Sequence, residues 1–205
     1  MRLFVAVDID SGVRQKIADF CDELRQRAKA LAPRARIAWA RTDQLHVTVR
    51  FVGEVEAAQG TAIAAALQPE LAIESFNMIV KGTGAFAPSG APRVFWAGIA
   101  NGAGELSAIE QEVSGRLAAC GVELEREGRP YRPHLTLARV RDASGLRSAP
   151  LFEALSGRGF GVTRVDAITL FESRTSPRGA TYESLQRTPL RRRCVGRTLD
   201  TSPAR

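Results

Sequence analysis

Residues 133 to 139 read Pro-His-Leu-Thr-Leu-Ala-Arg, and this short stretch decides how the whole chain is interpreted. Its histidine is followed by an apolar residue, a threonine and a second apolar residue. The chain holds only one other histidine, His46, which lies in the stretch 45–51, Leu-His-Val-Thr-Val-Arg-Phe, and carries the same tail. Given the composition, the chance that both histidines carry this tail is roughly one in ten thousand. The repetition therefore calls for a chemical reason.

The alternation of apolar and polar residues predicts a β-strand at each histidine. Side chains two residues apart on a strand share one face and lie about 7 Å apart. We therefore expect His46 and Thr48 to point one way on the first strand, and His134 and Thr136 to do the same on the second. The residues expected to anchor the two strands in a core are Val47, Val49, Phe51, Leu135 and Leu137.

The order of a helix followed by a histidine strand occurs twice, with the two histidines 88 positions apart. Amphipathic helices are predicted at 12–31, where Asp10 and Ser11 can cap the helix, at 57–68 and at 105–121, with a short helix at 149–157. Strands are predicted at 2–9, 36–40, 72–86, 93–99, 162–173 and 180–190. The pattern indicates an α+β fold with two pseudo-symmetric lobes of antiparallel strands backed by helices, in a single bilobal domain over 1–190.

The composition is that of an ordinary soluble domain, with 44% apolar and 25% charged residues in 205. No apolar stretch approaches the ~20 residues of a membrane span, so no membrane association is expected. The cysteines Cys21, Cys120 and Cys194 are few and widely spaced, which disfavours a disulfide framework or a zinc site and favours a reducing, cytoplasmic location.

The net charge of +7 is concentrated at the end of the chain. Residues 191–205 hold five arginines and one aspartate, so this segment contributes +4. A basic protein favours anionic partners such as nucleic acid. A basic, flexible tail with no specific role explains the same charge.

Two imidazoles and two hydroxyls around one point suit the cleavage of a phosphodiester. Histidine can both accept and donate a proton near neutral pH, so one imidazole can act as general base and the other as general acid. The hydroxyls of Thr48 and Thr136 can donate hydrogen bonds to phosphate oxygens. This chemistry requires no metal, no cofactor and no covalent nucleophile.

Other interpretations of these residues are weaker or stay open. A lone histidine on a strand is usually structural, but a matched pair favours function. A metal site with two histidine ligands is disfavoured, because neither strand places a carboxylate or a cysteine beside its histidine. Arg139 either binds phosphate or a base, or faces solvent. Phe51 can stack on a base only if it leaves the core. Tyr131 and Arg132 are further candidates to line the groove.

Through these two motifs the chain resembles the two-histidine (2H) phosphoesterases, and among them the bacterial RNA 2′,3′-cyclic phosphodiesterases, also called 2′-5′ RNA ligases. The resemblance covers about residues 1–190 and includes the flanking stretches 84–99, 129–141 and 170–185. The first motif departs mildly, with Val49 where leucine is common. Residues 191–205 lie outside the resemblance.

The resemblance implies a two-lobed enzyme with its active site in the cleft between the lobes. It implies that His46 is the proton donor to the leaving 3′ oxygen and that His134 is the proton acceptor that activates water. Thr48 and Thr136 then hold the phosphate. The substrate is RNA or a nucleotide with a 2′,3′-cyclic phosphate, and the product is a 2′-phosphate. We expect a monomer. Reversible 2′-5′ ligation at the same site, or an RNA-end-binding module without turnover, are the alternatives.

Overall fold

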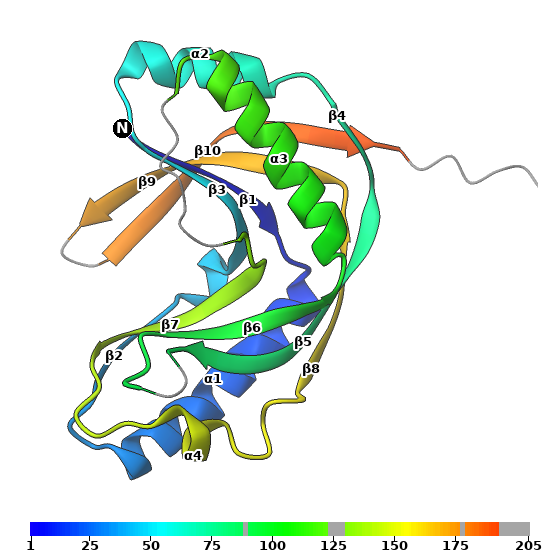
Figure 1. The fold of residues 1–205 in the computed structure, drawn as a ribbon. Coiled ribbons are helices and arrows are strands. Elements are labelled where there is room, and N and C mark those ends of the chain that lie inside the picture. Colours follow the sequence, from blue (N-terminus) through cyan, green and yellow to red (C-terminus); the bar gives the residue numbers. More distant parts are fainter. Residues whose placement is uncertain (88–89, 123–129, 177–178, 193–205) are drawn as a thin grey trace, which may run out of the picture.

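The structure is a computed structural model that describes residues 1–87, 90–122, 130–176 and 179–192. It contains helices and strands in mixed order (Figure 1). The helical elements are α1 (Ser11–Leu31), the single 3₁₀ turn η1 (Thr42–Gln44), α2 (Ala57–Leu67), α3 (Ala103–Ala119) and α4 (Ser148–Phe152). The strands are β1 (Arg2–Asp8), β2 (Arg36–Trp39), β3 (His46–Glu54), β4 (Leu71–Glu74), β5 (Phe76–Phe86), β6 (Val94–Asn101), β7 (His134–Asp142), β8 (Gly159–Val165), β9 (Ala167–Ser176) and β10 (Gly179–Arg191).

The strands form two half-sheets that meet at the two histidine strands. The first half-sheet has the order β4-β10-β9-β1-β3, and the second has the order β7-β6-β5-β8 with β2 paired to the other edge of β7. Between β3 and β7 the ladder consists of the single antiparallel pair Val47 and Leu135. Figure 1 shows the two half-sheets facing one another across this seam. The predicted α+β, two-lobed architecture is confirmed.

Each of the two long helices, α1 and α3, packs on one half-sheet but follows a strand of the other half-sheet in the chain. Helix α1 follows β1 of the first half-sheet but contacts β8 of the second, while α3 follows β6 of the second and contacts β3 and β4 of the first. The helices thus lie on the outer faces of the two half-sheets (Figure 1). Helix α1 begins where expected, since the Asp10 carboxylate accepts a hydrogen bond from the Gly12 amide at 2.8 Å. Each lobe therefore contacts a long helix that follows a strand of the other lobe.

Two strands predicted as continuous are broken where the chain crosses between half-sheets. The strand expected at 72–86 is β4 and β5, separated at Ser75, whose amide donates to the Arg191 carbonyl at 2.8 Å. The strand expected at 162–173 is β8 and β9, separated at Asp166, whose carbonyl accepts from the Leu190 amide at 2.8 Å. The expected short helix at 149–157 is the shorter α4. At both strand breaks, tertiary hydrogen bonding ends a run that local propensity would continue.

Two remaining expectations concern the membrane and the arginine-rich end. Within the described part of the chain, no helix is long and apolar enough to cross a bilayer. Residues 193–205, most of the predicted basic tail, lie outside the described residues.

Candidate active site

The four predicted site residues come together because of the register at the seam. Val47 pairs with Leu135, and both are fully buried, so their side chains point into the core. In an antiparallel pair this register sets His46 opposite Thr136 and Thr48 opposite His134. All four then point to the other face, which we call the histidine face. In a regular ladder the two histidines would be diagonal neighbours, about 7–8 Å apart. A phosphate group fits between two imidazoles at that spacing.

Each imidazole is held in the same way by the backbone just before it. His46 Nδ1 lies 2.8 Å from the Gln44 carbonyl oxygen, and His134 Nδ1 lies 2.7 Å from the Arg132 carbonyl oxygen. A carbonyl can only accept, so Nδ1 carries the proton in both rings. In the neutral imidazole this leaves Nε2 unprotonated. The pair therefore offers two Nε2 atoms for proton transfer.

The two hydroxyls complete the quartet. Both threonines are partly buried, and within the described residues neither hydroxyl makes a hydrogen bond to the protein. Such donors are available to the nonbridging oxygens of a phosphate.

Aromatic rings pack against both histidines. The Phe4 ring centroid lies 5.0 Å from that of His46, with Tyr182 meeting the same imidazole edge-on at 5.4 Å. His134 is met edge-on by Phe86 at 4.9 Å. These contacts fix the planes of the two imidazole rings. They also shield the rings from water, which disfavours the charged imidazolium form.

Burial lowers the pKa of His46 below its usual value of 6.5. The hydrogen bond to the Gln44 carbonyl and the charge of Asp8 raise the pKa of His46 and offset part of this effect. The positive charges of Arg14 and Arg139 lower the same pKa further. His46 therefore responds to charges from both half-sheets, since Arg139 is on β7 and Asp8 is on β1.

Both histidine strands carry a β-bulge three residues after the histidine. On β3, Val49 has no partner on β1, because Thr48 pairs with Ala6 and Arg50 with Val5. The bulge reverses the alternation beyond it. The expectation that Phe51 lies in the core is therefore wrong. Its side chain is 52% exposed and its ring lies 6.4 Å from Phe4, on the histidine face.

The same bulge on β7 brings Arg139 to the surface. Leu137 has no partner on β6, because Thr136 pairs with Trp96 and Ala138 with Phe95. Ala138 is buried, and Arg139 is exposed. The fifth residue after each histidine thus leaves the core, as Phe51 on one strand and Arg139 on the other.

The core residue at the β3 bulge is Arg50, whose guanidinium points toward the helix side of the sheet. It forms an ion pair with Glu110 of α3 at 3.1 Å, and the two side chains are only 13% and 14% exposed. A mostly covered charge pair of this kind holds β3 against its helix.

Several residues that serve the site were not predicted. Asp8 pairs with His46 across the β1–β3 ladder, whereas His134 pairs with Gly98. Arg14 of α1 donates hydrogen bonds to the carbonyls of Thr42 at 2.8 Å and Leu45 at 3.3 Å, and so braces the turn that carries Gln44. Of the two further candidates to line the groove, Tyr131 donates from its hydroxyl to the Thr48 carbonyl at 2.9 Å and links the two motifs, and Arg132 supplies the carbonyl at His134.

Fold and site together define a two-histidine phosphoesterase, and comparison with known proteins gives the family. The family model described as the 2′-5′ RNA ligase superfamily matches residues 13–177. The chain belongs to this superfamily, as its two motifs predicted. An RNA 2′,3′-cyclic phosphodiesterase of Archaeoglobus fulgidus is 32% identical over 188 residues, which cover 91% of this chain and 98% of that protein.

Solved structures support the same assignment. The crystal structure of TT0787 of Thermus thermophilus matches with a TM-score of 0.71 and 26% identity, covering 92% of this chain and 97% of that one. The crystal structure of E. coli LigT complexed with 3′-AMP matches with a TM-score of 0.66 and 25% identity, covering 92% of this chain and 96% of that one.

Proposed function

We propose that this protein hydrolyses the 2′,3′-cyclic phosphate at the end of an RNA, or of a nucleotide, to a 2′-phosphate. The observation that carries the proposal is the Val47–Leu135 register, from which we infer that two imidazoles and two hydroxyls share one face. Relatives named RNA 2′,3′-cyclic phosphodiesterase over nearly their whole length support the choice of substrate.

In the proposed reaction, His134 is the general base and His46 is the general acid. His134 Nε2 takes a proton from water as the water oxygen attacks phosphorus. The bond from phosphorus to the 3′ oxygen breaks, and the proton on His46 Nε2 goes to that oxygen. The 2′ oxygen keeps the phosphate. Proton exchange with solvent then returns both imidazoles to their starting states.

The assignment of acid and base rests on the family resemblance and is supported by the unequal neighbours of the two rings. The carboxylate of Asp8 favours the charged form of His46, and the ladder position opposite His134 is Gly98, which has no side chain. Burial lowers the pKa of His46 in the free enzyme and so favours the neutral ring before substrate binds. The negative charge of the bound phosphate raises that pKa and favours the protonated acid.

We propose that Thr48 and Thr136 donate to the nonbridging phosphate oxygens as charge develops on them. Beyond the phosphate, the exposed ring of Phe51 offers a stacking surface for the terminal base. Arg139 offers a positive charge close enough to act on the pKa of His46, and so lies within reach of a bound phosphate or base.

The proposed reaction needs no metal ion or cofactor, because the imidazoles move the protons and the hydroxyls hold the phosphate. Both motifs come from one chain, so the site is complete in a monomer. The described cysteines Cys21 and Cys120 are free thiols, in keeping with a cytoplasmic enzyme.

The test is to incubate the protein with adenosine 2′,3′-cyclic phosphate and follow the phosphorus by ³¹P NMR. We expect complete conversion to adenosine 2′-phosphate, at the same rate with and without EDTA. A 3′-phosphate product would overturn the acid and base assignment. Strong inhibition by EDTA would overturn the metal-free mechanism, and tight binding without product would leave only an RNA-end-binding module.

Ligation is the same chemistry with the 5′-hydroxyl of a second RNA in place of water: its oxygen attacks phosphorus, its proton goes to the base, and the 3′ oxygen leaves with a proton from the acid. The superfamily name favours testing it. A labelled RNA with a 5′-hydroxyl, added at millimolar concentration with the cyclic-ended RNA, would be extended through a 2′-5′ linkage if the site also runs in this direction.

A further inference from the structure

The surface beyond the end of β7 carries a group of exposed arginines next to the proposed site. Arg93, Arg141 and Arg147 are exposed, and among the described residues none has an acidic partner. The one nearby carboxylate, Asp142, accepts from Ser144 and lies 3.9 Å from Arg36. We call Arg141 and Arg147 the arginine group. It has a net positive charge that the local carboxylate does not balance.

The ladder between β6 and β7 connects the arginine group to the active site. Arg139 pairs with Val94, and one residue further the Val140 amide donates to the Arg93 carbonyl at 2.8 Å. Arg93 therefore lies opposite Val140 and shares its face, whereas Arg141 shares the face of Arg139, so Arg93 is not part of the arginine group. From His134 to Asp142 the strand runs nine residues, which span about 30 Å in an extended conformation. That length suits a track of several nucleotides.

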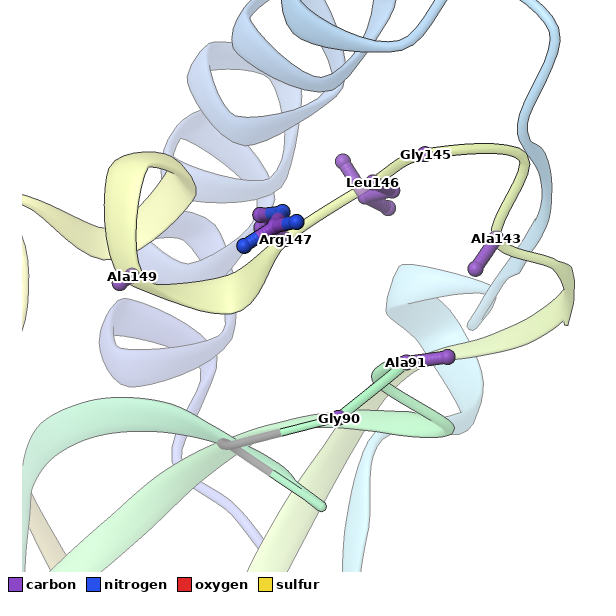
Figure 2. Close-up of a pocket in the computed structure, with 7 residues that line it drawn as sticks. All are labelled: Gly90, Ala91, Ala143, Gly145, Leu146, Arg147 and Ala149. Atoms are coloured by element: carbon purple, nitrogen blue, oxygen red, sulfur yellow. The ribbon is translucent and has the colours of Figure 1, made fainter.

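A cavity of about 380 Å³ opens just beyond the end of this ladder. Figure 2 shows it between the β5–β6 loop at Gly90 and Ala91 and the segment that follows β7. The walls are glycine backbone, alanine side chains and Leu146, with Arg147 supplying the charge. A lining of small residues with a cation suits a ribonucleoside and its phosphate without selecting a particular base.

Along β9 and β10 of the first half-sheet, two arginines are balanced by carboxylates. There Arg174 is paired with both Glu172 at 2.9 Å and Glu183 at 2.8 Å, and Arg187 is paired with Asp166 at 2.8 Å. Arg174 and Arg187 therefore offer a polyanion less unbalanced positive charge than Arg141 and Arg147 do, although Arg191 at the end of β10 is also exposed.

We propose that the arginine group and the cavity form a binding track for the RNA strand on the 5′ side of the cyclic end. This proposal rests on the proposed function and deepens it, because it makes an RNA strand, and not a mononucleotide, the preferred substrate. The arginines contact backbone phosphates and the cavity holds one upstream nucleoside. Contacts to phosphate position a strand without reading its sequence.

The experiment compares two substrates of the same protein, adenosine 2′,3′-cyclic phosphate and a six-nucleotide RNA ending in the same group. We expect kcat/KM for the RNA to be at least tenfold higher at low salt. The kcat/KM for the RNA should fall as salt concentration rises, linearly on a log–log plot. The slope should become shallower by about 0.7 for each phosphate contact that a substitution removes. R141Q and R147Q should each lower kcat/KM for the RNA about fivefold and change the mononucleotide value less than twofold.

The matched control is R174Q, which removes one arginine charge from the other half-sheet and should leave the preference for RNA unchanged. Equal kcat/KM and equal salt dependence for the two substrates would overturn the track. An R174Q effect as large as that of R141Q would overturn its location. If the proposed function itself is wrong, neither substrate is turned over, so the two failures are distinguishable.

Discussion

The two histidine strands, β3 and β7, carry the same motif and hold its histidine in the same way, but they differ in their other neighbours. Both place a histidine and a threonine on the histidine face, bind the imidazole Nδ1 to the carbonyl two residues earlier, and carry a bulge after the threonine. Their neighbours differ. The ladder partner of His46 is Asp8 and that of His134 is Gly98, and the residue released by the bulge is Phe51 on β3 and Arg139 on β7.

This contrast separates two jobs that a symmetric site must perform. Holding a phosphate with two equivalent nonbridging oxygens is a symmetric task, and the repeated residues suit it. Donating one proton and accepting another is not symmetric, and neither is binding a nucleoside on one side of the phosphorus. The differences between β3 and β7 are therefore where the direction of the reaction is to be sought.

The largest expected effect comes from removing either imidazole. H46A and H134A should each lower kcat by roughly 10² to 10⁴, the usual contribution of a general acid or base. The two variants should differ in their activity on a cyclic phosphodiester whose leaving group is an aryl oxygen, because such a leaving group needs no proton. H46A should regain most of its activity with that substrate, and H134A should not.

Circular dichroism and the thermal midpoint would confirm that both variants fold. Rescue of H134A in place of H46A would reverse the assignment of acid and base. Near-normal activity of either variant with the RNA substrate would refute the two-histidine mechanism.

The next effect is on the symmetric part of the site. T48V and T136V remove one hydroxyl each with little change in shape, and each should lower kcat roughly a hundredfold, since a phosphate oxygen loses its donor in the transition state. Similar losses would support equivalent roles. A loss confined to KM in one variant would show that its hydroxyl binds only the ground state.

A third prediction concerns the core side of the two bulges, where β3 has Arg50 and β7 has Ala138. E110Q takes away the carboxylate that faces Arg50 and should destabilise the fold by about 3 kcal/mol, because it breaks a charge pair whose two side chains are mostly covered. Urea unfolding should show a lower midpoint with an unchanged slope.

The control for E110Q is E105Q, the same substitution on the first turn of the same helix α3, where the carboxylate has no ion-pair partner among the described residues. It should change stability by less than about 0.5 kcal/mol. Equal effects of the two substitutions would mean that the Arg50–Glu110 pair contributes nothing specific.

The same strands show how far the sequence predicts the structure. Alternation placed Val47, Val49, Leu135 and Leu137 in the core, and all four are buried. The prediction failed at Phe51, because a bulge is a feature of the pairing between two strands and leaves no mark in the alternation of one. Once the partner strand skips Val49, every later residue changes face.

The supports of the site were hidden for a related reason. Gln44 and Arg132 hold the imidazoles through their carbonyl oxygens, which every residue type has, so no side chain signals the role. Asp8 lies 38 positions before His46 and meets it only through the β1–β3 register. The repeated motif indicates the proposed chemistry because the proposed reacting groups are side chains. It gives no information about supports that come from the backbone or from a neighbouring strand.

The smallest effect, and the most direct test of the difference between the two strands, is the pH dependence after D8N. Asp8 raises the pKa of His46, so removing its charge should lower that pKa further, by a small amount because the carboxylate is exposed and screened by salt. If His46 is the acid, it must be protonated, and its titration sets the alkaline side of the profile of kcat/KM, which reports on the free enzyme. The alkaline side should therefore move to lower pH, while the acidic side, set by His134, stays in place.

D10N is the matched control, because asparagine also caps α1 and Asp10 is not among the charges that shift the pKa of His46. Movement of the acidic side in D8N, with the alkaline side fixed, would instead make His46 the base. The sign of one small shift thus decides between the two directions that a two-fold symmetric motif allows. It does so through the one carboxylate that pairs with a histidine on β3 and has glycine as its counterpart on β7.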